Sequence, residues 1–311
     1  MKNILILGGN GFLGTNIIRH IDEHLSDQYR VIVFDKFPRN PFGESFQCVT
    51  RSYAGDFMDS VLLEKVFDEN QIEMVIHSLS TTVPALSLNA KYDVESNLVP
   101  TIELLNCMVK HQINDIIYIS SGGAVYGDNS SNKHVETEDV FPISSYGVVK
   151  LAIEKYLKQY ASLYGMRPLI VRLSNPYGPY HYSKKQGICN VALESALRND
   201  EFSVWGNGKA RKDYIYVTDF VNILFLLMQK GAWGEVINVG SGQTLSVDEI
   251  LCQIKAMLPS FSWSYTDASL FDVAQFGLNT SKLHSIIGDY TFVNMKDGLE
   301  KTLQWYRAIG L

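Results

Sequence analysis

The sequence predicts an α/β fold built on a doubly wound parallel sheet, and three observations support this prediction. Short, continuous apolar runs recur along the chain, as expected for strands buried on both faces of a parallel sheet. Segments with helical spacing of apolar residues separate most of these runs, which indicates alternating strands and helices. The first run leads directly into a glycine-rich turn. The candidate strands are residues 4–7, 31–34, 74–77, 116–119, 169–173 and 236–239.

The glycine-rich turn lies between the first strand and the first helix. Gly8, Gly11 and Gly14 follow one regular spacing, and a Gly-x-Gly-x-x-Gly spacing also begins at Gly9. Glycine lets the backbone approach a pyrophosphate closely, and the N-terminus of the following helix offers free N–H groups and a partial positive charge. Asp35 ends the second strand about 20 residues later, where a carboxylate accepts ribose hydroxyls and repels a 2′-phosphate. The pattern predicts a Rossmann-type dinucleotide site that prefers NAD to NADP.

The alternation of strands and helices is interrupted from about residue 175 by a loop rich in Pro, Tyr, Gly and His. Further on, Ser246 and Glu249 have the spacing of a capping box, which predicts a helix over residues 250–258. No internal repeat or low-complexity linker is visible, so we expect interwoven lobes. The expected division is an NAD-binding domain over residues 1–174, rejoined by 217–240, and a smaller α/β substrate-binding lobe over residues 175–216 and 241–311.

Composition excludes several classes of protein. With 311 residues, 46% of them hydrophobic, the chain can bury a large core. A net charge of −6 leaves no basic surplus for a nucleic-acid backbone. The four cysteines are scattered without zinc or disulfide spacing, so we expect reduced packing residues and no metal site. The first apolar run is too short for a signal peptide, and no run approaches the roughly 20 apolar residues of a membrane span. We therefore expect a cytoplasmic protein.

Tyr146 and Lys150 are spaced to share one face of a helix, one turn apart. Tyrosine ordinarily has a pKa of about 10, and lowering it to 7 requires about 4 kcal/mol of added phenolate stabilisation. A lysine ammonium one turn away and the charge of an oxidised nicotinamide are suitable sources. Ser120 and Ser121 end the preceding strand, at the edge where open parallel sheets bind ligands. We expect both hydroxyls to face the cofactor groove.

With these motifs, the chain resembles the extended short-chain dehydrogenases/reductases, specifically the NAD-dependent nucleotide-sugar epimerase and dehydratase family, and most of all its UDP-glucose 4-epimerase members. The resemblance spans nearly the whole chain. The motifs that carry it are residues 8–14, Asp35, Asp56 and Phe57, residues 77–80, Asn97, residues 120–127, Tyr146, Lys150, residues 172–179 and residues 213–217.

The resemblance implies particular roles for these positions. Asp56 and Phe57 would flank the adenine, Leu79 and Ser80 would line the cofactor groove, and Lys150 would hold the nicotinamide ribose. Asn97 would support the sheet near the site. The implied cofactor-binding residues are Gly8, Gly11, Phe12, Leu13, Gly14, Asp35, Lys36, Asp56, Phe57, Leu79, Ser80, Asn97, Ser120, Tyr146, Lys150 and Leu173. The implied substrate-binding residues are Ser121, Gly122, Tyr146, Asn175 at the diphosphate, Gly187, Arg211, Lys212 and Tyr214.

The implied activity is that of an NAD-dependent nucleotide-sugar 4-epimerase acting on a UDP-hexose or a UDP-N-acetylhexosamine. Tyr146 would take the C4 hydroxyl proton while the sugar is transiently oxidised at C4, and the keto-sugar would rotate before hydride returns. Small residues at positions 122–124 would leave room for this rotation. A homodimer formed through the helix near residues 94–111 and the helix carrying Tyr146 and Lys150 is also implied.

Other activities stay open at this point. A nucleotide-sugar dehydratase, decarboxylase or reductase of the same family is one group of alternatives, and a non-catalytic NAD-binding regulator is another. Family dehydratases carry an Asp-Glu pair after the strand-end threonine, whereas this chain has Gly123 and Ala124 there. The sequence therefore lacks the acid and base for elimination across C5 and C6.

Two departures from the family pattern bear on the site. Gly122 stands where the family usually has a catalytic serine or threonine, and we expect Ser121 to supply that hydroxyl. Lys212 and Ser269 stand where the family commonly has phosphate-binding arginines, and lysine acts as a point charge rather than a bidentate fork. Arg211 is a candidate replacement.

Two histidines and three tyrosines also attract attention. His77 ends a predicted strand with no second metal ligand nearby in sequence, so a structural hydrogen bond is expected rather than a metal site. For His181 the sugar pocket and the loop surface are both open, and for Tyr177, Tyr180 and Tyr182 both ligand stacking and ordinary packing are open.

Overall fold

A seven-stranded sheet forms the centre of the protein, whose computed structural model describes residues 1–83, 87–127, 133–183, 186–267 and 274–311. All neighbouring strands in this sheet run parallel. The fold class predicted from the sequence is therefore confirmed. From one edge to the other the strands are β10 (Val236–Val239), β6 (Arg167–Leu173), β5 (Asp115–Ser121), β4 (Met74–His77), β1 (Lys2–Leu7), β2 (Tyr29–Asp35) and β3 (Val49–Ala54).

All six predicted strands are present in this sheet, and β3 is the strand of this sheet that was not predicted. It lies at the sheet edge beside β2, and most of its side chains are exposed. An exposed edge strand lacks the continuous apolar run that marks a central strand. The strand order reverses at β1, because β2 and β3 lie on one side of it and β4, β5 and β6 on the other. Open parallel sheets bind ligands at the carboxyl ends of the strands beside such a reversal.

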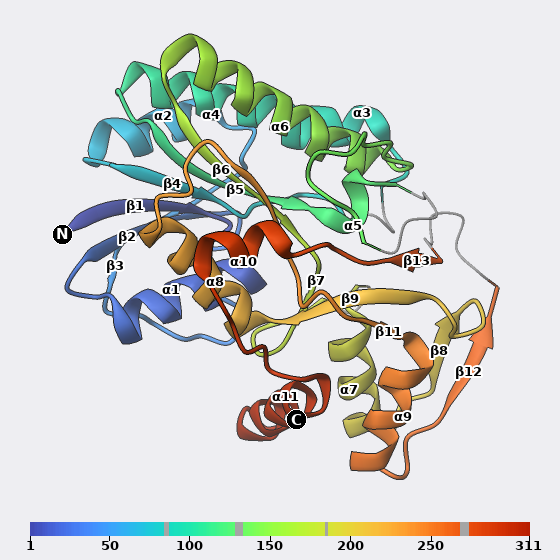
Figure 1. Cartoon of the computed structure of the whole chain (residues 1–311). Coiled ribbons are helices and arrows are strands. Elements are labelled where there is room, and N and C mark those ends of the chain that lie inside the picture. The colour runs from blue at the N-terminus through green and yellow to red at the C-terminus, as the bar shows by residue number, and fades with distance from the viewer. Residues whose placement is uncertain (84–86, 128–132, 184–185, 268–273) are drawn as a thin grey trace.

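Helices cover both faces of the large sheet (Figure 1). One face packs against α1, α8 and α10, and the other packs against α2, α4 and α6. A short helix and a π-helical turn lead into α4, and another short helix follows β5. The bounds are α1 (Phe12–His24), α2 (Ser60–Glu69), α3 (Ala90–Asp93), the π-helical turn (Val94–Leu98), α4 (Val99–Lys110), α5 (Gly122–Val125), α6 (Ser145–Tyr164), α8 (Val217–Gln229) and α10 (Ser281–Ile287).

A smaller group of elements packs around its own hydrophobic cluster. A small sheet joins β9 to β7, β11 and β13, and a separate pair joins β8 to β12. The division into two lobes stays a prediction. Helix α10, which belongs to the region 241–311, packs against α8 and β10 of the large sheet. The bounds are β7 (Asn175–Tyr177), α7 (Ile188–Arg198), β8 (Phe202–Trp205), β9 (Arg211–Tyr216), β11 (Thr244–Ser246), α9 (Val247–Met257), β12 (Trp263–Thr266), β13 (Gln275–Phe276) and α11 (Met295–Ala308).

Helix α9 begins with the predicted capping box. The Ser246 hydroxyl accepts from the Glu249 N–H at 3.1 Å, and the Ser246 N–H donates to the Glu249 carboxylate at 2.7 Å. The helix begins at Val247 rather than at residue 250, because the capping residue directly precedes the first helical residue.

Two sequence expectations concern the chain as a whole. Cys48, Cys107 and Cys189 are buried and unpaired, whereas Cys252 is unpaired and exposed. Buried cysteines of this kind behave as small packing residues. Across the described residues, no helix combines the length and the apolar character needed to cross a membrane.

Candidate active site

The glycine turn after β1 is shaped to hold a phosphate group. Gly8 has a φ of +76°, and a Cβ there would lie 3.0 Å from the Leu79 backbone. A Cβ on Gly14 would lie 2.1 Å from the Gly8 carbonyl oxygen. Helix α1 begins directly after Gly11, and no side chain caps it. The first-turn N–H groups are therefore available to an anion, which fits the pyrophosphate of NAD.

Asp35 lies at the end of β2, beside this turn. One of its carboxylate oxygens accepts from the Asn10 N–H and the other from the Phe37 N–H, both at 3.0 Å. Burial raises the pKa of Asp35, and backbone N–H groups oppose that shift. A carboxylate oxygen can accept two hydrogen bonds, so each oxygen of Asp35 can accept a further bond from a ribose hydroxyl. Lys36, the next residue, is exposed.

The other cofactor candidates border the groove to different degrees. Phe57 is buried with its ring 5.4 Å from that of His77, whereas Asp56 is exposed and accepts from the Met58 N–H at 3.0 Å. Leu173 is 3% exposed at the end of β6, where it belongs to the hydrophobic core. Three further cofactor candidates, Phe12, Leu13 and Leu79, are half-buried.

Helix α6 presents Tyr146 and Lys150 at its N-terminal end. The Ser144 hydroxyl caps the helix by accepting from the Gly147 N–H at 3.2 Å, and the Tyr146 N–H donates to the Ser87 hydroxyl at 2.7 Å. The Lys150 ammonium donates to the Ile119 carbonyl at 2.9 Å. Its Nζ lies 5.7 Å from the centre of the Tyr146 ring. The predicted pair is thus brought together at the carboxyl end of β5.

Burial disfavours the charged forms of both side chains, the Tyr146 phenolate and the Lys150 ammonium. Burial raises the pKa of Tyr146 to about 12, and hydrogen bonds to the side chains of Ser121 and Ser80 oppose the rise. Burial lowers the pKa of Lys150 to about 8, and the Glu154 carboxylate opposes the fall. Ser121 therefore contacts Tyr146, whereas its expected role of sharing the substrate hydroxyl with this tyrosine stays a prediction. Ser80, which was expected to line the cofactor groove, also contacts it.

A cavity of about 10 Å³ lies beneath Tyr146 and Lys150. Its lining residues include His77, Thr82 and Tyr118. Within the described residues, the buried His77 Nδ1, Thr82 Oγ1 and Tyr118 hydroxyl have no hydrogen-bond partner. His77 Nε2 lies 3.0 Å from the Thr101 hydroxyl, which confirms the structural hydrogen bond expected for this histidine. The cavity is mainly apolar, with a few polar groups in its lining residues.

Asn97 also lines this cavity, from the π-helical turn. Its Oδ1 accepts from the Thr81 N–H at 2.9 Å, and its Nδ2 donates to the Thr81 hydroxyl at 2.6 Å. Asn97 therefore fastens the segment after β4, which includes Ser80, to the helix layer. This contact supports the expected role near the site.

The expectation that the Ser120 hydroxyl faces the cofactor groove is wrong. Ser120 is 3% exposed, and its hydroxyl donates to the Glu154 carboxylate at 2.6 Å. Successive side chains of a strand point to opposite faces, and Ser120 shares the α6-covered face with Tyr118. Burial against Glu154 thus removes this hydroxyl from the groove.

The room expected at Gly122 is also occupied. A Cβ on Gly122 would lie 3.1 Å from Leu278 and 3.2 Å from Phe276, and one on Gly123 would contact the same phenyl ring at 3.8 Å. Small residues at these positions thus admit two large side chains of the segment around β13, not free space for a turning sugar. Sequence spacing cannot reveal this, because the contact joins residues more than 150 positions apart.

The substrate candidates on the second lobe gather around β9. Asn175 donates to the Asp213 carbonyl at 2.8 Å, which links β7 to β9. Lys212 and Tyr214 lie on the same strand, and Tyr214 is buried. Arg211 donates to the Thr244 carbonyl at 2.7 Å and pairs with Glu249 at 3.0 Å. This geometry does not support Arg211 as a replacement phosphate clamp, and Ser269 lies outside the described residues.

His181 and Gly187 bring the loop after β7 against the glycine turn. The His181 ring makes an edge contact with Phe12 at 4.9 Å, and burial lowers its pKa to about 4. Gly187 has a φ of +89° and precedes α7, where a Cβ would lie 2.6 Å from His181. His181 is therefore buried beside the cofactor groove rather than on the loop surface. Of the nearby tyrosines, Tyr177 and Tyr180 are buried and Tyr182 is exposed.

Sequence reasoning missed several groups that shape the site. Glu154 follows Lys150 by one helical turn, so its spacing was a usable signal. The Ser87 contact depends on a loop fold that no local pattern reveals. A possible metal-ligand group among the described residues, Glu64, Asp68 and His111, lies on α2 and after α4, where Lys110 already pairs with Glu64. It is separate from the site.

Comparison with known proteins identifies the family of the chain. A model described as the NAD dependent epimerase/dehydratase family matches residues 4–240. The chain is 29% identical over 316 residues to a putative UDP-glucose 4-epimerase of Methanocaldococcus jannaschii, with 98% of each protein covered. It is 27% identical over 336 residues to a dTDP-glucose 4,6-dehydratase of Haemophilus influenzae, again with 98% of each covered.

A solved structure agrees with these sequence matches. UDP-glucose 4-epimerase of Thermotoga maritima, determined with UDP-glucose, aligns with a TM-score of 0.91 at 29% identity and covers 98% of this chain and 99% of that chain. NAD is the cofactor of the matched family, and the glycine turn with Asp35 fits it. The chain therefore belongs to the NAD-dependent epimerase/dehydratase family, a group of extended short-chain dehydrogenases/reductases acting on nucleotide sugars.

Proposed function

We propose that the protein is an NAD-dependent nucleotide-sugar 4-epimerase whose substrate is a UDP-hexose or a UDP-N-acetylhexosamine. The observation that carries the proposal is the placement of Tyr146 against Ser121 and above Lys150, at the sheet edge next to the glycine turn. A phenol held by a serine hydroxyl and backed by an ammonium is suited to moving one proton on and off a sugar hydroxyl.

The chain's own residues would divide the work as follows. The glycine turn and Asp35 would hold NAD, which when bound supplies a hydride acceptor that later returns the hydride. Tyr146 would remove the proton of the C4 hydroxyl and give it back after the keto-sugar has turned. Ser121 would hold the phenolate by donating to it, and Lys150 would hold the nicotinamide ribose. Asn175 and Lys212 would bind the diphosphate.

A dehydratase is the nearest rival, and curated dehydratases are among the relatives. Elimination across C5 and C6 needs an acid and a base beside the sugar. Gly123 and Ala124 stand where family dehydratases have that pair, and Phe276 packs against Gly123. In the part of the chain that the structure describes, no carboxylate lines the cavity at Tyr146. These observations favour the epimerase.

A substrate panel separates the candidates. Purified protein, without added NAD, is incubated with UDP-glucose, UDP-N-acetylglucosamine, their galacto epimers and dTDP-glucose, and the sugars are followed by NMR. Interconversion of gluco and galacto forms supports the proposal. A 4-keto-6-deoxy product identifies a dehydratase, and a requirement for external cofactor identifies a reductase or dehydrogenase. Bound NAD without turnover identifies a regulator. Tyr146→Phe is the control for catalysis at this site.

We also propose that the chain forms a homodimer through α4 and α6. The exposed face of α6 carries an apolar stripe of Val148, Tyr156 and Leu163, which are 52%, 36% and 63% exposed. Their spacing of eight and seven residues keeps them on one helix face. Val99 at the start of α4 is 47% exposed, and α4 packs beside α6. A second copy would cover this face.

A further inference from the structure

A buried ion pair lies beneath the catalytic helix, one turn beyond Lys150. Arg172 Nη2 donates to the Glu154 carboxylate at 2.8 Å, and Nε donates to its two oxygens at 3.2 and 3.3 Å. Glu154 is 1% exposed and Arg172 is 4% exposed. The Ser120 hydroxyl donates to the same carboxylate. Both oxygens of Glu154 are therefore satisfied and fixed in place.

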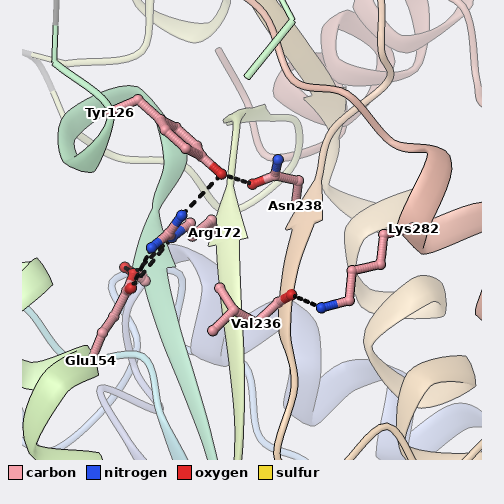
Figure 2. Close-up of polar contacts among 7 residues, drawn as sticks. Tyr126, Glu154, Arg172, Val236, Asn238 and Lys282 are labelled. Carbon is pink, nitrogen blue, oxygen red and sulfur yellow. Dashed lines mark hydrogen bonds and ion pairs between the residues drawn. The ribbon is translucent and has the colours of Figure 1, made fainter. Parts of the chain in front are cut away.

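Arg172 lies on β6 and is linked through the Tyr126 hydroxyl to Asn238 on the neighbouring strand β10 (Figure 2). Arg172 lies in register between Ser120 on β5 and Asn238 on β10, so the three side chains share one face. Arg172 Nη1 donates to the Tyr126 hydroxyl at 3.0 Å, and that hydroxyl donates to Asn238 Oδ1 at 2.7 Å. The network fixes the position of the Glu154 carboxylate relative to the strand ends.

Stability alone does not account for this arrangement. The cost of desolvating two charges largely offsets their attraction, and apolar residues of similar volume often replace a buried pair without loss. The pair does fix the Glu154 carboxylate at a chosen place, one helical turn beyond Lys150. Tyr146, Lys150 and Glu154 recur every four residues and so lie along one face of α6.

We propose that Glu154 is a positioning residue that keeps the buried Lys150 ammonium charged, and that Arg172 and Ser120 hold Glu154 at the required place. The proposal rests on the proposed function of Lys150 as the residue that holds the nicotinamide ribose. Glu154 touches neither cofactor nor substrate in this scheme. It acts through Lys150, which would lose its proton and its hold on the ribose if the neighbouring carboxylate were neutral.

Among the groups around Lys150, Glu154 supplies the negative charge, and the Arg172 guanidinium from β6, which pairs with Glu154, supplies a positive charge that offsets part of it. From β4, His77 faces the lysine and has a pKa lowered to about 3 by burial and by the lysine itself, so it is neutral. From β5, Tyr118 presents its ring 4.9 Å from Nζ, and burial keeps its hydroxyl protonated. Tyr146 is the third neighbour. Among the described residues, Glu154 is the carboxylate whose charge raises the pKa of Lys150.

The test uses a variant that removes both charges while keeping the fold. Glu154→Gln with Arg172→Met retains an acceptor for Ser120 and leaves no uncompensated charge. The matched control is Asp115→Asn with Arg167→Met, because that pair joins β5 to β6 by two 2.8 Å hydrogen bonds at the opposite ends of the strands. Thermal unfolding checks each fold, and NMR of isotope-labelled lysine, assigned with Lys150→Met, follows Lys150 in NAD-loaded protein.

We expect the Lys150 titration midpoint to fall by about one pH unit in Glu154→Gln, which removes only an opposite charge. In the Glu154/Arg172 variant the fall should be smaller, because the like charge of Arg172 is removed as well. The control variant and Glu154→Asp, which keeps the charge, should titrate like the unmodified protein. An unchanged midpoint in a folded Glu154/Arg172 variant overturns the proposal. If that variant fails to fold, the Lys150 titration is measured in Glu154→Gln alone, and an unchanged midpoint in that variant also overturns the proposal.

The measurement also separates this inference from the proposed function. If the protein proves not to be an epimerase, the Lys150 titration is still readable and still tests Glu154. If it is an epimerase, turnover of the Glu154/Arg172 variant should fall away at lower pH than turnover of the unmodified protein. A variant that is active with an unshifted alkaline limb would show that the ion pair is only structural.

Discussion

Replacing Ser121 by alanine is the sharpest test of the reaction site. The Tyr146 hydroxyl contacts both Ser121 and Ser80, and its pKa is about 12 even with those contacts. Ser80 already donates its only hydroxyl proton to the Thr82 carbonyl at 2.9 Å, so Ser121 is the better donor to a phenolate. A hydrogen bond to a charged group contributes about 1.5–3 kcal/mol. Ser121→Ala should therefore slow turnover by about 10- to 150-fold.

The assay is turnover at saturating nucleotide sugar over a range of pH. Loss of a donor raises the pKa of Tyr146, so the deficit should be largest at low pH and shrink as pH rises. Ser121→Thr should restore most of the activity, and Ser80→Ala is the matched control with the smaller expected loss. Turnover of Ser121→Ala within a few-fold of the unmodified protein, at every pH, would refute the reasoning.

Four further predictions follow from the same geometry. Gly14→Ala places a Cβ 2.1 Å from the Gly8 carbonyl, so the purified variant should lose its bound NAD, as measured by nucleotide release on denaturation. Lys150→Met should abolish turnover yet stabilise the NAD-free fold by up to about 3 kcal/mol below pH 8, because it removes a buried ammonium. The gain in stability should fade between pH 8 and 10.5, as the unmodified lysine loses its proton. A melting temperature below that of the unmodified protein contradicts this prediction. Asp35→Asn removes a charge that repels a 2′-phosphate, so titration calorimetry should show relative affinity for NADP rising by roughly tenfold. Val148→Glu should convert a dimer to monomers in light scattering, whereas exposed Val61→Glu on α2 should not.

The fold was predictable because its signals are local. Buried strands of a parallel sheet are continuous apolar runs, and each of the six runs forms a strand. Edge strand β3 is polar because it is exposed, so its formation depends on pairing with β2 rather than on its own composition. The placement of α10 against the large sheet likewise depends on contacts between distant parts of the chain.

In the candidate site too, the features set by local spacing were predictable, and those set by contacts between distant residues were not. Tyr146 and Lys150 lie on one helix, and the glycine turn lies within one loop, so spacing along the chain was enough to find them. The orientation of Ser120 depends on which face of β5 meets α6, and the filling of the space at Gly122 depends on Phe276 arriving from far along the chain. Such contacts are decided by tertiary packing, which residue spacing does not encode.

The electrostatics of the site explain why an acidic group belongs near Lys150. Burial opposes the phenolate at Tyr146 and the ammonium at Lys150 at the same time. The positive charge of an oxidised nicotinamide beside them would favour the phenolate, but it would also favour loss of the lysine proton. A fixed carboxylate one turn further along α6 lies nearer to Lys150 than to Tyr146. It therefore opposes loss of the lysine proton more strongly than it opposes formation of the phenolate. Glu154 has this position, and Arg172 and Ser120 hold its carboxylate there by hydrogen bonds.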